Sequence, residues 1–195
     1  MSNSDNQTAI LDAAEALLAH HGASKTGVVD VARALGMSHA NVYRYFSNKS
    51  ALFDAVAERW LERDSAPLFK IARGRTEPSA RLKRWLLAIF RNKRRKVIEE
   101  PELFAFYKAL NAETTQNFVA RHTADLAKQL GHILDDGAAS GDFILANRDA
   151  AIRTILDATA SLRHPAIVAD PKAIDEKRVV AIADMIVAGL RKGVF

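Results

Sequence analysis

The chain has 195 residues, 49% of them hydrophobic and 26% charged, and a formal net charge of +5. It is long enough to bury a hydrophobic core, and the absence of cysteine excludes disulfides, catalytic thiolates and Cys-based zinc sites. No apolar run reaches the roughly 20 residues that a membrane span needs, and residues 1–7 lack the features of a signal peptide, so we expect a cytoplasmic protein.

The first predicted helix covers residues 4–21. Its apolar residues recur with a period of 3.6 and include Ile10, Ala14 and Leu18. Gly22 follows at the position where a left-handed residue commonly ends a helix. We expect this helix to pack behind the segment that follows it, because two short helices alone cannot close a core.

Residues 26–52 predict two short helices joined by a tight turn, followed by the start of a third. Thr26 is the expected N-cap of the first helix, which ends at Gly36. Ser38 is the expected N-cap of the second helix, which buries Val42 and Phe46. The positions of this helix that are left free to project are His39, Ala40, Asn41, Tyr43 and Arg44. This is the helix-turn-helix arrangement, in which the second helix enters the major groove of DNA.

The distribution of charge matters more for this reading than the net charge. Residues 1–64 contain six Lys/Arg and eight Asp/Glu, so this end of the chain is slightly acidic. Between Asp30 and Asp54, however, there is no acidic residue, whereas Arg33, Arg44 and Lys49 lie in that window. A surface built from this window would meet phosphate without repulsion.

The rest of the chain predicts helices and no strand. A fourth helix begins after Asn48 and is expected to continue towards residue 69, long enough to leave a first domain and reach a second. Further helices are predicted at residues 80–97, 101–110, 114–136, 148–162 and 175–191. The predicted fold is therefore all-α with about nine helices, divided into a helix-turn-helix domain (1–50) and a second helical domain (51–195).

The last two predicted helices are apolar over a wider arc than a surface helix needs to face one core. Either both fill the middle of a monomer, or one side of each meets a second subunit in a four-helix contact. We favour the homodimer, because a single short recognition helix reads few bases. The residues expected at the interface are Ile152, Ile155, Leu156, Thr159, Val179, Ile182, Ala183, Ile186 and Leu190.

A family resemblance rests on the same N-terminal residues. Gly22, Thr26, residues 36–38 (GMS) and above all residues 43–52 (YRYFSNKSAL) resemble the N-terminal signature of the TetR (tetracycline repressor-like) regulators. The resemblance covers roughly residues 8–54, and beyond them only the number and length of the helices are similar. It implies a DNA-binding regulator whose second domain binds a small effector, and we expect a repressor that binds a near-palindromic operator as a homodimer.

Carried over to this chain, the resemblance implies two kinds of DNA contact. Thr26, Tyr43, Tyr45 and Lys49 would contact phosphates, while His39, Ala40, Asn41 and Arg44 would approach bases, with Ser38 at the start of the reading helix. Side-chain chemistry agrees with this division, since asparagine pairs with adenine, arginine with guanine, and a methyl group contacts thymine. An idle surface position for His39 and core positions for the tyrosines are the alternatives.

Candidates for an effector site are the bulky side chains of the middle helices, although an ordinary core would use the same residues. They are Trp60, Trp85, Phe90, Phe104, Tyr107 and Phe118, with His122 and His164 as polar groups. The basic run at residues 91–96 is interpreted as a solvated helix face, with an anionic effector or DNA backbone as alternatives. No metal or other cofactor is expected, although His122, Asp125, His132 and Asp135 share one predicted helix.

The competing classes are a helical enzyme and an effectorless DNA-binding dimer with a purely structural second domain. The sequence contains no nucleophile motif, phosphate-binding glycine loop or metalloprotease motif, so an enzyme is not expected. A ligand cavity in the second domain would argue against the effectorless dimer.

Overall fold

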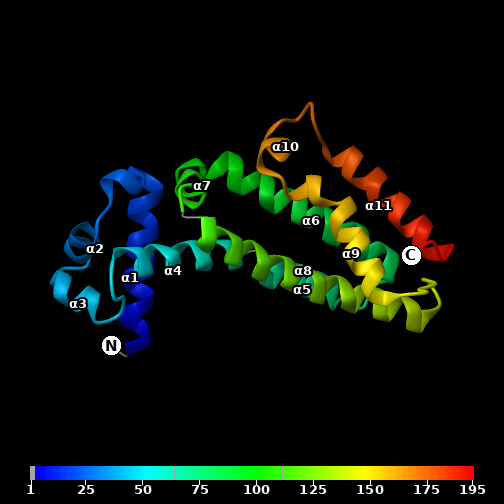
Figure 1. The fold of residues 1–195 in the computed structure, drawn as a ribbon, viewed down its shortest axis with the longest axis horizontal. Helices are drawn as coiled ribbons and strands as arrows, with labels where there is room; N and C mark the ends of the chain where they lie inside the picture. Colours follow the sequence, from blue (N-terminus) through cyan, green and yellow to red (C-terminus); the bar gives the residue numbers. More distant parts are fainter. Residues whose placement is uncertain (1–2, 64, 111) are drawn as a thin grey trace. The chain divides into compact units, whose positions relative to one another are not determined.

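A computed structural model describes residues 3–63, 65–110 and 112–195, and within these ranges the chain forms helices and loops without a strand (Figure 1). The predicted all-α class is confirmed. The α-helices are α1 (Asn3–His21), α2 (Val28–Ala34), α3 (His39–Tyr43), α4 (Lys49–Glu62), α5 (Ser65–Ala72), α6 (Pro78–Glu99), α7 (Pro101–Lys108), α8 (Ala112–Ser140), α9 (Arg148–Ala158), α10 (Pro165–Ala169) and α11 (Glu176–Arg191). Two short 3-10 helices, η1 (Ala23–Lys25) and η2 (Ala160–Arg163), complete them.

Two helix ends differ from the sequence prediction. The N-cap of α2 is Gly27 rather than Thr26. The predicted fourth helix does not run to residue 69, because α4 ends at Glu62 and a separate helix, α5, begins at Ser65. The predicted long connection between domains through one continuous helix is therefore wrong.

The chain divides into two compact units, and the division does not follow a single cut. The first unit comprises the described residues of Met1–Arg63 and Glu99–Val119, and the second comprises those of Asp64–Ile98 and Ala120–Phe195. Helix α7 thus belongs with the helix-turn-helix rather than with the helices that flank it in sequence. The division at residue 50 stays a prediction about where the DNA-contacting part of the chain ends.

In the first unit, α7 packs against α1 and α4 through aromatic side chains. The rings of Phe53 and Phe106 meet edge to face with centroids 5.5 Å apart. Trp60 contacts both Phe104 and Tyr107, and its indole N–H donates to the Glu100 carboxylate. These contacts hold α4 along its length.

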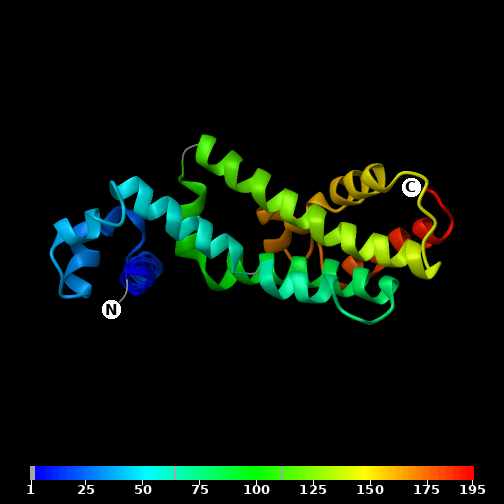
Figure 2. The same cartoon turned by 90° about the horizontal axis from the view of Figure 1, so that it is seen from below.

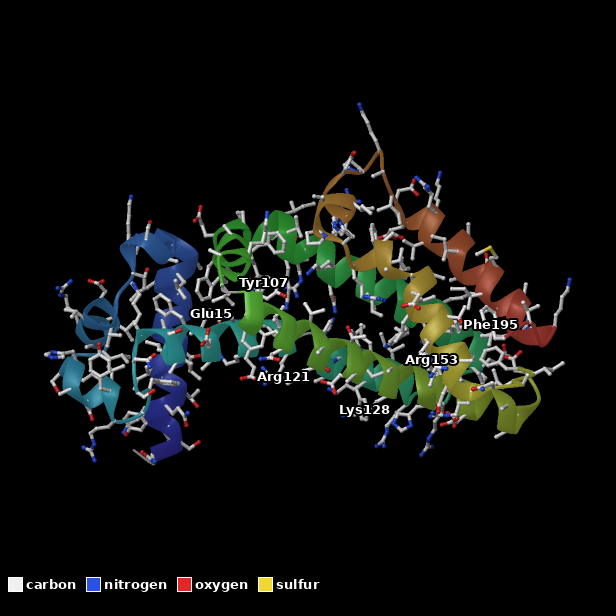
Figure 3. All side chains as sticks on the ribbon, viewed as in Figure 1. Glu15, Tyr107, Arg121, Lys128, Arg153 and Phe195 are labelled. Atoms are coloured by element: carbon white, nitrogen blue, oxygen red, sulfur yellow. The ribbon has the colours of Figure 1, made fainter. Side chains whose placement is uncertain are left out.

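A cluster of ion pairs joins α1 to α4 on another side of the same helix. Arg59 donates to Asp12 at 2.8 Å and to Glu15 at 2.9 Å, and Arg63 also donates to Glu15 (Figure 3). Because one carboxylate is shared by two arginines, ordering these side chains costs less entropy than two isolated pairs would. Helix α4 is therefore fixed to both α1 and α7.

The core of the second unit is built from α5, α6, α8, α9 and α11. Helix α5 lies along α8 (Figure 2), and the ring of Phe69 contacts that of His132. Trp85 is fully buried, and its indole N–H donates to the buried Gln129 side chain at 2.8 Å. The buried Arg81 donates to the Ala72 carbonyl, which ends α5, and to the Asp136 carboxylate on α8. The Trp85 and Gln129 side chains and the terminal nitrogen of Arg81 thus have specific partners, whereas Nε of Arg81 is buried without one.

One end of the second unit is closed by the loop after α8. The Asp142 carboxylate accepts hydrogen bonds from the Ser79 backbone N–H and from Arg191, so it joins the start of α6 to the end of α11. Burial opposes ionisation, but these hydrogen bonds hold the pKa of Asp142 below its usual value. Phe143 then packs its ring directly on the backbone of α8 at Gly137.

The residues predicted for a subunit interface occupy a different place. Eight of the nine are buried in the core of the single chain, and Ile182 is half-buried, so these side chains do not form a surface for a second subunit. The wide apolar arc of the last helix instead has two parts, one facing the core and one facing outwards. The outer part, which we call the outer face of α11, consists of Val180, Ala181, Asp184, Met185 and Ala188, and its one carboxylate, Asp184, pairs with Lys83 of α6. Val180 is 41% and Met185 is 65% exposed.

Within the described ranges, no helix is long and apolar enough to cross a membrane.

Candidate nucleic-acid interface

The turn between α2 and α3 is fixed by backbone hydrogen bonds at the end of α2. The Met37 N–H donates to the Ala32 carbonyl at 3.0 Å, and the Gly36 N–H donates to the Arg33 carbonyl at 3.1 Å. This is the Schellman pattern, which needs a left-handed residue at its centre. Gly36 has φ +63°, a conformation that costs a glycine nothing. The turn predicted from the sequence is therefore present, and glycine occupies its left-handed position.

The start of α2 explains the position of Thr26. The Asp30 carboxylate accepts a hydrogen bond from the Gly27 N–H at 2.9 Å and so closes the first turn. Thr26 lies just before it with only 2% of its surface exposed, and its hydroxyl donates to the Gly22 carbonyl at 2.9 Å. Its side chain thus ties the end of α1 to the start of α2, a role that differs from the implied contact with phosphate.

Helix α3 presents a polar face to solvent. Ser38 is its N-cap as predicted, because its hydroxyl oxygen accepts a hydrogen bond from the Asn41 N–H at 3.3 Å. Val42 is fully buried, which fixes the orientation of the short helix. His39 and Ala40 are exposed and Asn41 is half-buried, so the first turn of α3 places these three side chains at the surface.

The two tyrosines near the end of α3 have different surroundings. Tyr43 is 44% exposed, and its ring meets that of His39 edge to face with centroids 6.3 Å apart. Tyr45 is half-buried, and its hydroxyl accepts a hydrogen bond from the Asn6 side chain on α1 at 3.1 Å. No local sequence pattern indicates this role for Asn6. The Tyr45 hydroxyl keeps its own proton for a further acceptor.

Lys49 stands at the first position of α4, whose N-cap is Asn48 as predicted. The Asn48 side chain accepts from the Ala51 N–H at 2.8 Å. The Lys49 ammonium lies 4.9 Å from the centre of the Phe53 ring, a position of cation–π attraction. An ammonium at the N-terminus of a 14-residue helix combines its charge with the backbone N–H groups and the helix dipole, and both favour an anion there.

The two acidic side chains that bound this segment in sequence have partners within the chain. Asp30 is paired with Arg33 at 3.1 Å, and Asp54 accepts a hydrogen bond from Ser50. Burial raises the pKa of Asp54, and the hydrogen bond from Ser50 acts in the opposite sense. The exposed groups from α3 and from the start of α4 include hydrogen-bond donors and the Lys49 ammonium, which are suited to phosphates and base edges.

Two family models match the chain, and together they cover both units. Residues 10–56 match the model of "Bacterial regulatory proteins, tetR family", and residues 78–187, more than half of the chain, match "Tetracyclin repressor-like, C-terminal domain". The chain belongs to the TetR family. It is a DNA-binding transcriptional regulator of a family that is not enzymatic, and the resemblance seen in its sequence is confirmed.

Individual relatives of this TetR-family chain agree with the family models. An uncharacterized HTH-type transcriptional regulator of Mycobacterium tuberculosis is 33% identical over 98 residues, which are 50% of this chain and 46% of that protein. The match spans about half the length of that relative. A TetR transcription regulator from Haloarcula marismortui has the same fold with a TM-score of 0.71 and 20% identity, covering 96% of this chain and 98% of that one. The SmeT–triclosan complex aligns with a TM-score of 0.68 and 22% identity, covering 98% and 94%.

The candidate effector residues of this regulator are divided between its two units. Trp60, Phe104 and Tyr107 form the aromatic contact of α4 with α7, and Phe118 is buried in the same unit. Burial raises the pKa of Tyr107. Trp85 and Phe90 are fully buried in the core of the second unit, where His122 is half-buried and His164 is exposed. The structure thus does not gather the eight within one unit.

The four residues weighed as a metal site have other surroundings. His132 contacts Phe69, and Asp135 accepts two hydrogen bonds from Arg148 that lower the pKa of its carboxyl group. In the part of the chain that the structure describes, no three metal-ligating side chains gather.

His122 is the most strongly perturbed histidine of the described residues. Burial, together with the positive charges of Lys93, Lys96 and Arg163, lowers its pKa to about 4, whereas Asp125 acts in the opposite sense. The imidazole is therefore neutral at pH 7.

This perturbation predicts a contribution of His122 to the pH dependence of stability. An unfolded chain binds the proton near pH 6.5, so the contribution is complete above that pH and is lost as the pH falls towards 4. In His122→Gln, the free energy of unfolding should fall by less over this range, with a difference of at most about 3 kcal/mol. Urea unfolding at stepped pH measures it, and His164→Gln, at an exposed histidine, is the control. Equal slopes in the wild type and His122→Gln would contradict the prediction.

Proposed function

We propose that this regulator is a repressor that binds a near-palindromic operator as a homodimer and is released by a small-molecule effector. The observation that carries the proposal is the polar face of α3, fixed by the Gly36 turn and by the buried Val42, beside the cationic start of α4. A helix presented in this way fits the major groove.

The side chains of this face divide into two roles. The phosphates are bound by Lys49, Tyr43 and Tyr45. These contacts set the register of the helix-turn-helix, which we call the head, on the duplex. His39, Ala40, Asn41 and Arg44 approach base edges. Ser38 acts by capping α3, and Thr26 acts by joining α1 to α2, since the hydroxyl of each already has a partner within the chain.

The outer face of α11 supports the dimer. Exposed Val180 and Met185 beside small alanines form a largely apolar strip, in which Asp184 is paired with Lys83, on a helix whose other side is already buried in the core. Small residues let a second helix approach closely, and a two-fold contact needs a single self-complementary surface. Two heads held in this way would read two half-sites about one helical turn apart.

Release by an effector is proposed as a population shift between two arrangements of the heads. The SmeT–triclosan complex shows that a protein of the same fold holds a small molecule, which supports a ligand for this chain. The chain connects the first unit to the second at two places through which such a shift would be transmitted. Helix α4 leads into α5, and α7 lies between α6 and α8 in sequence. An effector that changed neither operator affinity nor the spacing of the heads would contradict this mechanism.

The function is tested by selecting binding sites from random duplex DNA and footprinting the protein on the selected sequences. We expect an inverted repeat whose two halves are protected together, at protein concentrations that show a dimer. Enrichment of a single, non-repeated site by a monomer would overturn the proposal.

Lys49→Ala is expected to weaken binding to every DNA sequence and to reduce the slope of log affinity against log salt by about 1. The reason is that one phosphate contact, and the counterion that it releases, is lost. Titrations of operator and random DNA at several salt concentrations measure both effects. Lys172→Ala, at an exposed lysine of the second unit, should leave the slope unchanged.

Asn41→Ala and Arg44→Ala are expected to lose discrimination at particular base pairs, each worth roughly 1–3 kcal/mol. Binding of each variant to a panel of single-base operator variants locates the base pair. An equal loss of affinity for every DNA sequence would show that the residue contacts phosphate rather than a base.

A regulator without an effector is the second candidate. The complete burial of Trp85 and Phe90 in a packed core favours it, because these rings then serve packing alone. Binding of any small molecule that changes operator affinity would exclude this candidate.

A further inference from the structure

Basic side chains from three elements converge within the second unit. Lys93 and Lys96 come from α6, His122 comes from α8 and Arg163 ends η2. The charges of the two lysines and of the arginine all act on the His122 imidazole, so each of the three cations lies within electrostatic range of that ring. Lys96 is only 4% exposed, which distinguishes this group from an ordinary solvated run of surface charge.

Arg163 is oriented by neutral groups. Its guanidinium donates to the Leu156 carbonyl at 2.9 Å and to the Thr159 hydroxyl at 3.4 Å. Thr159 is fully buried, and its hydroxyl donates to the Ile155 carbonyl at 2.7 Å, so this acceptor is itself fixed. Across the described residues, no carboxylate lies within ion-pair distance of Arg163, and Asp157 acts on it only through space.

Two consequences follow from this orientation. Only two of the five N–H groups of the guanidinium donate hydrogen bonds within the chain. The other N–H groups lie in one plane, in a geometry that matches the oxygens of a carboxylate or phosphate. Burial also lowers the pKa of Arg163, because a half-buried cation without a counter-ion loses hydration. An anion bound to the remaining N–H groups of Arg163 would offset this loss of hydration.

His122 can complete such a site. Its ring is half-buried, and neither ring nitrogen has a hydrogen-bond partner among the residues that the structure describes. At neutral pH the uncharged ring has one N–H to donate, and an anion beside it would favour the doubly protonated ring. Asp125, one turn along α8, is the acidic group that faces it.

We propose that Arg163 and His122, with the ammonium groups of Lys93 and Lys96 adjacent, form an oxyanion-binding site in the second unit. The site takes the carboxylate or phosphate of a small organic effector. The two lysines also interact with other groups of the chain, so Arg163 and His122 carry the recognition. The inference rests on the proposed effector-controlled function and names the chemical class of the effector.

Benzoate and phenyl phosphate test the site, with benzamide as the uncharged analogue of benzoate. Calorimetric titration of the wild-type protein without DNA is expected to show binding of at least one anion and none of benzamide. Tighter binding of benzoate assigns a carboxylate, and tighter binding of phenyl phosphate assigns a phosphate. Failure of both anions to bind at about 10 mM, or equal binding of benzamide, would overturn the inference.

Arg163→Gln is expected to weaken binding of the preferred anion at least tenfold. The matched control is Arg153→Gln, which removes an exposed arginine of α9 in the same unit and should leave the affinity unchanged (Figure 3). Equal losses in both variants would show a general effect of charge and overturn the site.

A second variant keeps the test independent of the folding of Arg163→Gln. Inorganic sulfate stays fully ionised between pH 7.5 and 5.5, so the pH dependence of its binding reports protonation of the protein. Sulfate should bind more tightly at the lower pH in the wild type, and this gain should be reduced in His122→Gln. An unchanged gain in the variant would remove His122 from the site and overturn the proposal. Because no DNA is present, failure here leaves the operator-binding test of the proposed function untouched.

Discussion

Gly137→Ala is expected to destabilise the protein by about 2–4 kcal/mol. A Cβ atom at residue 137 would lie 2.0 Å from Cδ2 and 2.5 Å from Cε2 of the Phe143 ring, which is only 3% exposed. The ring would have to leave its place on α8, and displacing a buried phenylalanine costs about 3–5 kcal/mol. The better helix propensity of alanine returns about 1 kcal/mol. Urea unfolding followed by circular dichroism measures the difference.

A double-variant cycle isolates the cause. Phe143→Ala removes the ring, so Gly137→Ala introduced into that background should be neutral or slightly stabilising. If alanine at 137 destabilises both backgrounds equally, the clash with the ring is not the reason.

Met185→Glu is expected to convert the dimer into a monomer and to weaken operator binding. The side chain is 65% exposed in the single chain, on the outer face of α11. In the proposed dimer it would be buried, and an unpaired carboxylate there costs about 3 kcal/mol or more, which corresponds to roughly 100-fold weaker association. Sedimentation equilibrium measures the dissociation constant, and titration with a full inverted repeat measures the loss of cooperative DNA binding.

The matched control is Ile98→Glu. Ile98 is 53% exposed on α6, away from the outer face of α11 in sequence, so its replacement should leave the dimer intact. A Met185→Glu protein that stays dimeric would place the interface elsewhere. Unchanged melting temperatures in both variants would show that the single chain still folds.

The parts of the site that the sequence predicted are those with local chemistry. Ser38, Asn48 and Gly36 each act within a few residues, by accepting from a nearby N–H or by adopting a left-handed conformation, so residue type and spacing were sufficient. Thr26 shows the limit of this approach. It stands one residue before the true cap, Gly27, whose N–H is satisfied by Asp30 three residues later.

The parts that the sequence did not predict depend on contacts between distant segments. The apolar arc of α11 is wider than a helix packed on one core needs. Periodicity alone, however, does not tell whether Val179 or Val180 points inwards. The structure buries the first completely and exposes the second. Similarly, Trp60 could have lined a ligand pocket or packed on another helix. Its partners Glu100 and Phe104 lie some forty residues away, beyond the reach of any local pattern.

The composition of the first unit has a practical consequence for chimeric regulators. The proposed DNA-reading segment ends near residue 50, yet Phe53 and Trp60 of α4 are covered by side chains from α7, which follows 39 residues after α4 in the chain. A transplanted head made from residues 3–63 alone would carry these large rings uncovered into a foreign protein. Swapping operator specificity between relatives would therefore succeed by exchanging α3 side chains in place, or by moving residues 3–63 together with residues 99–110.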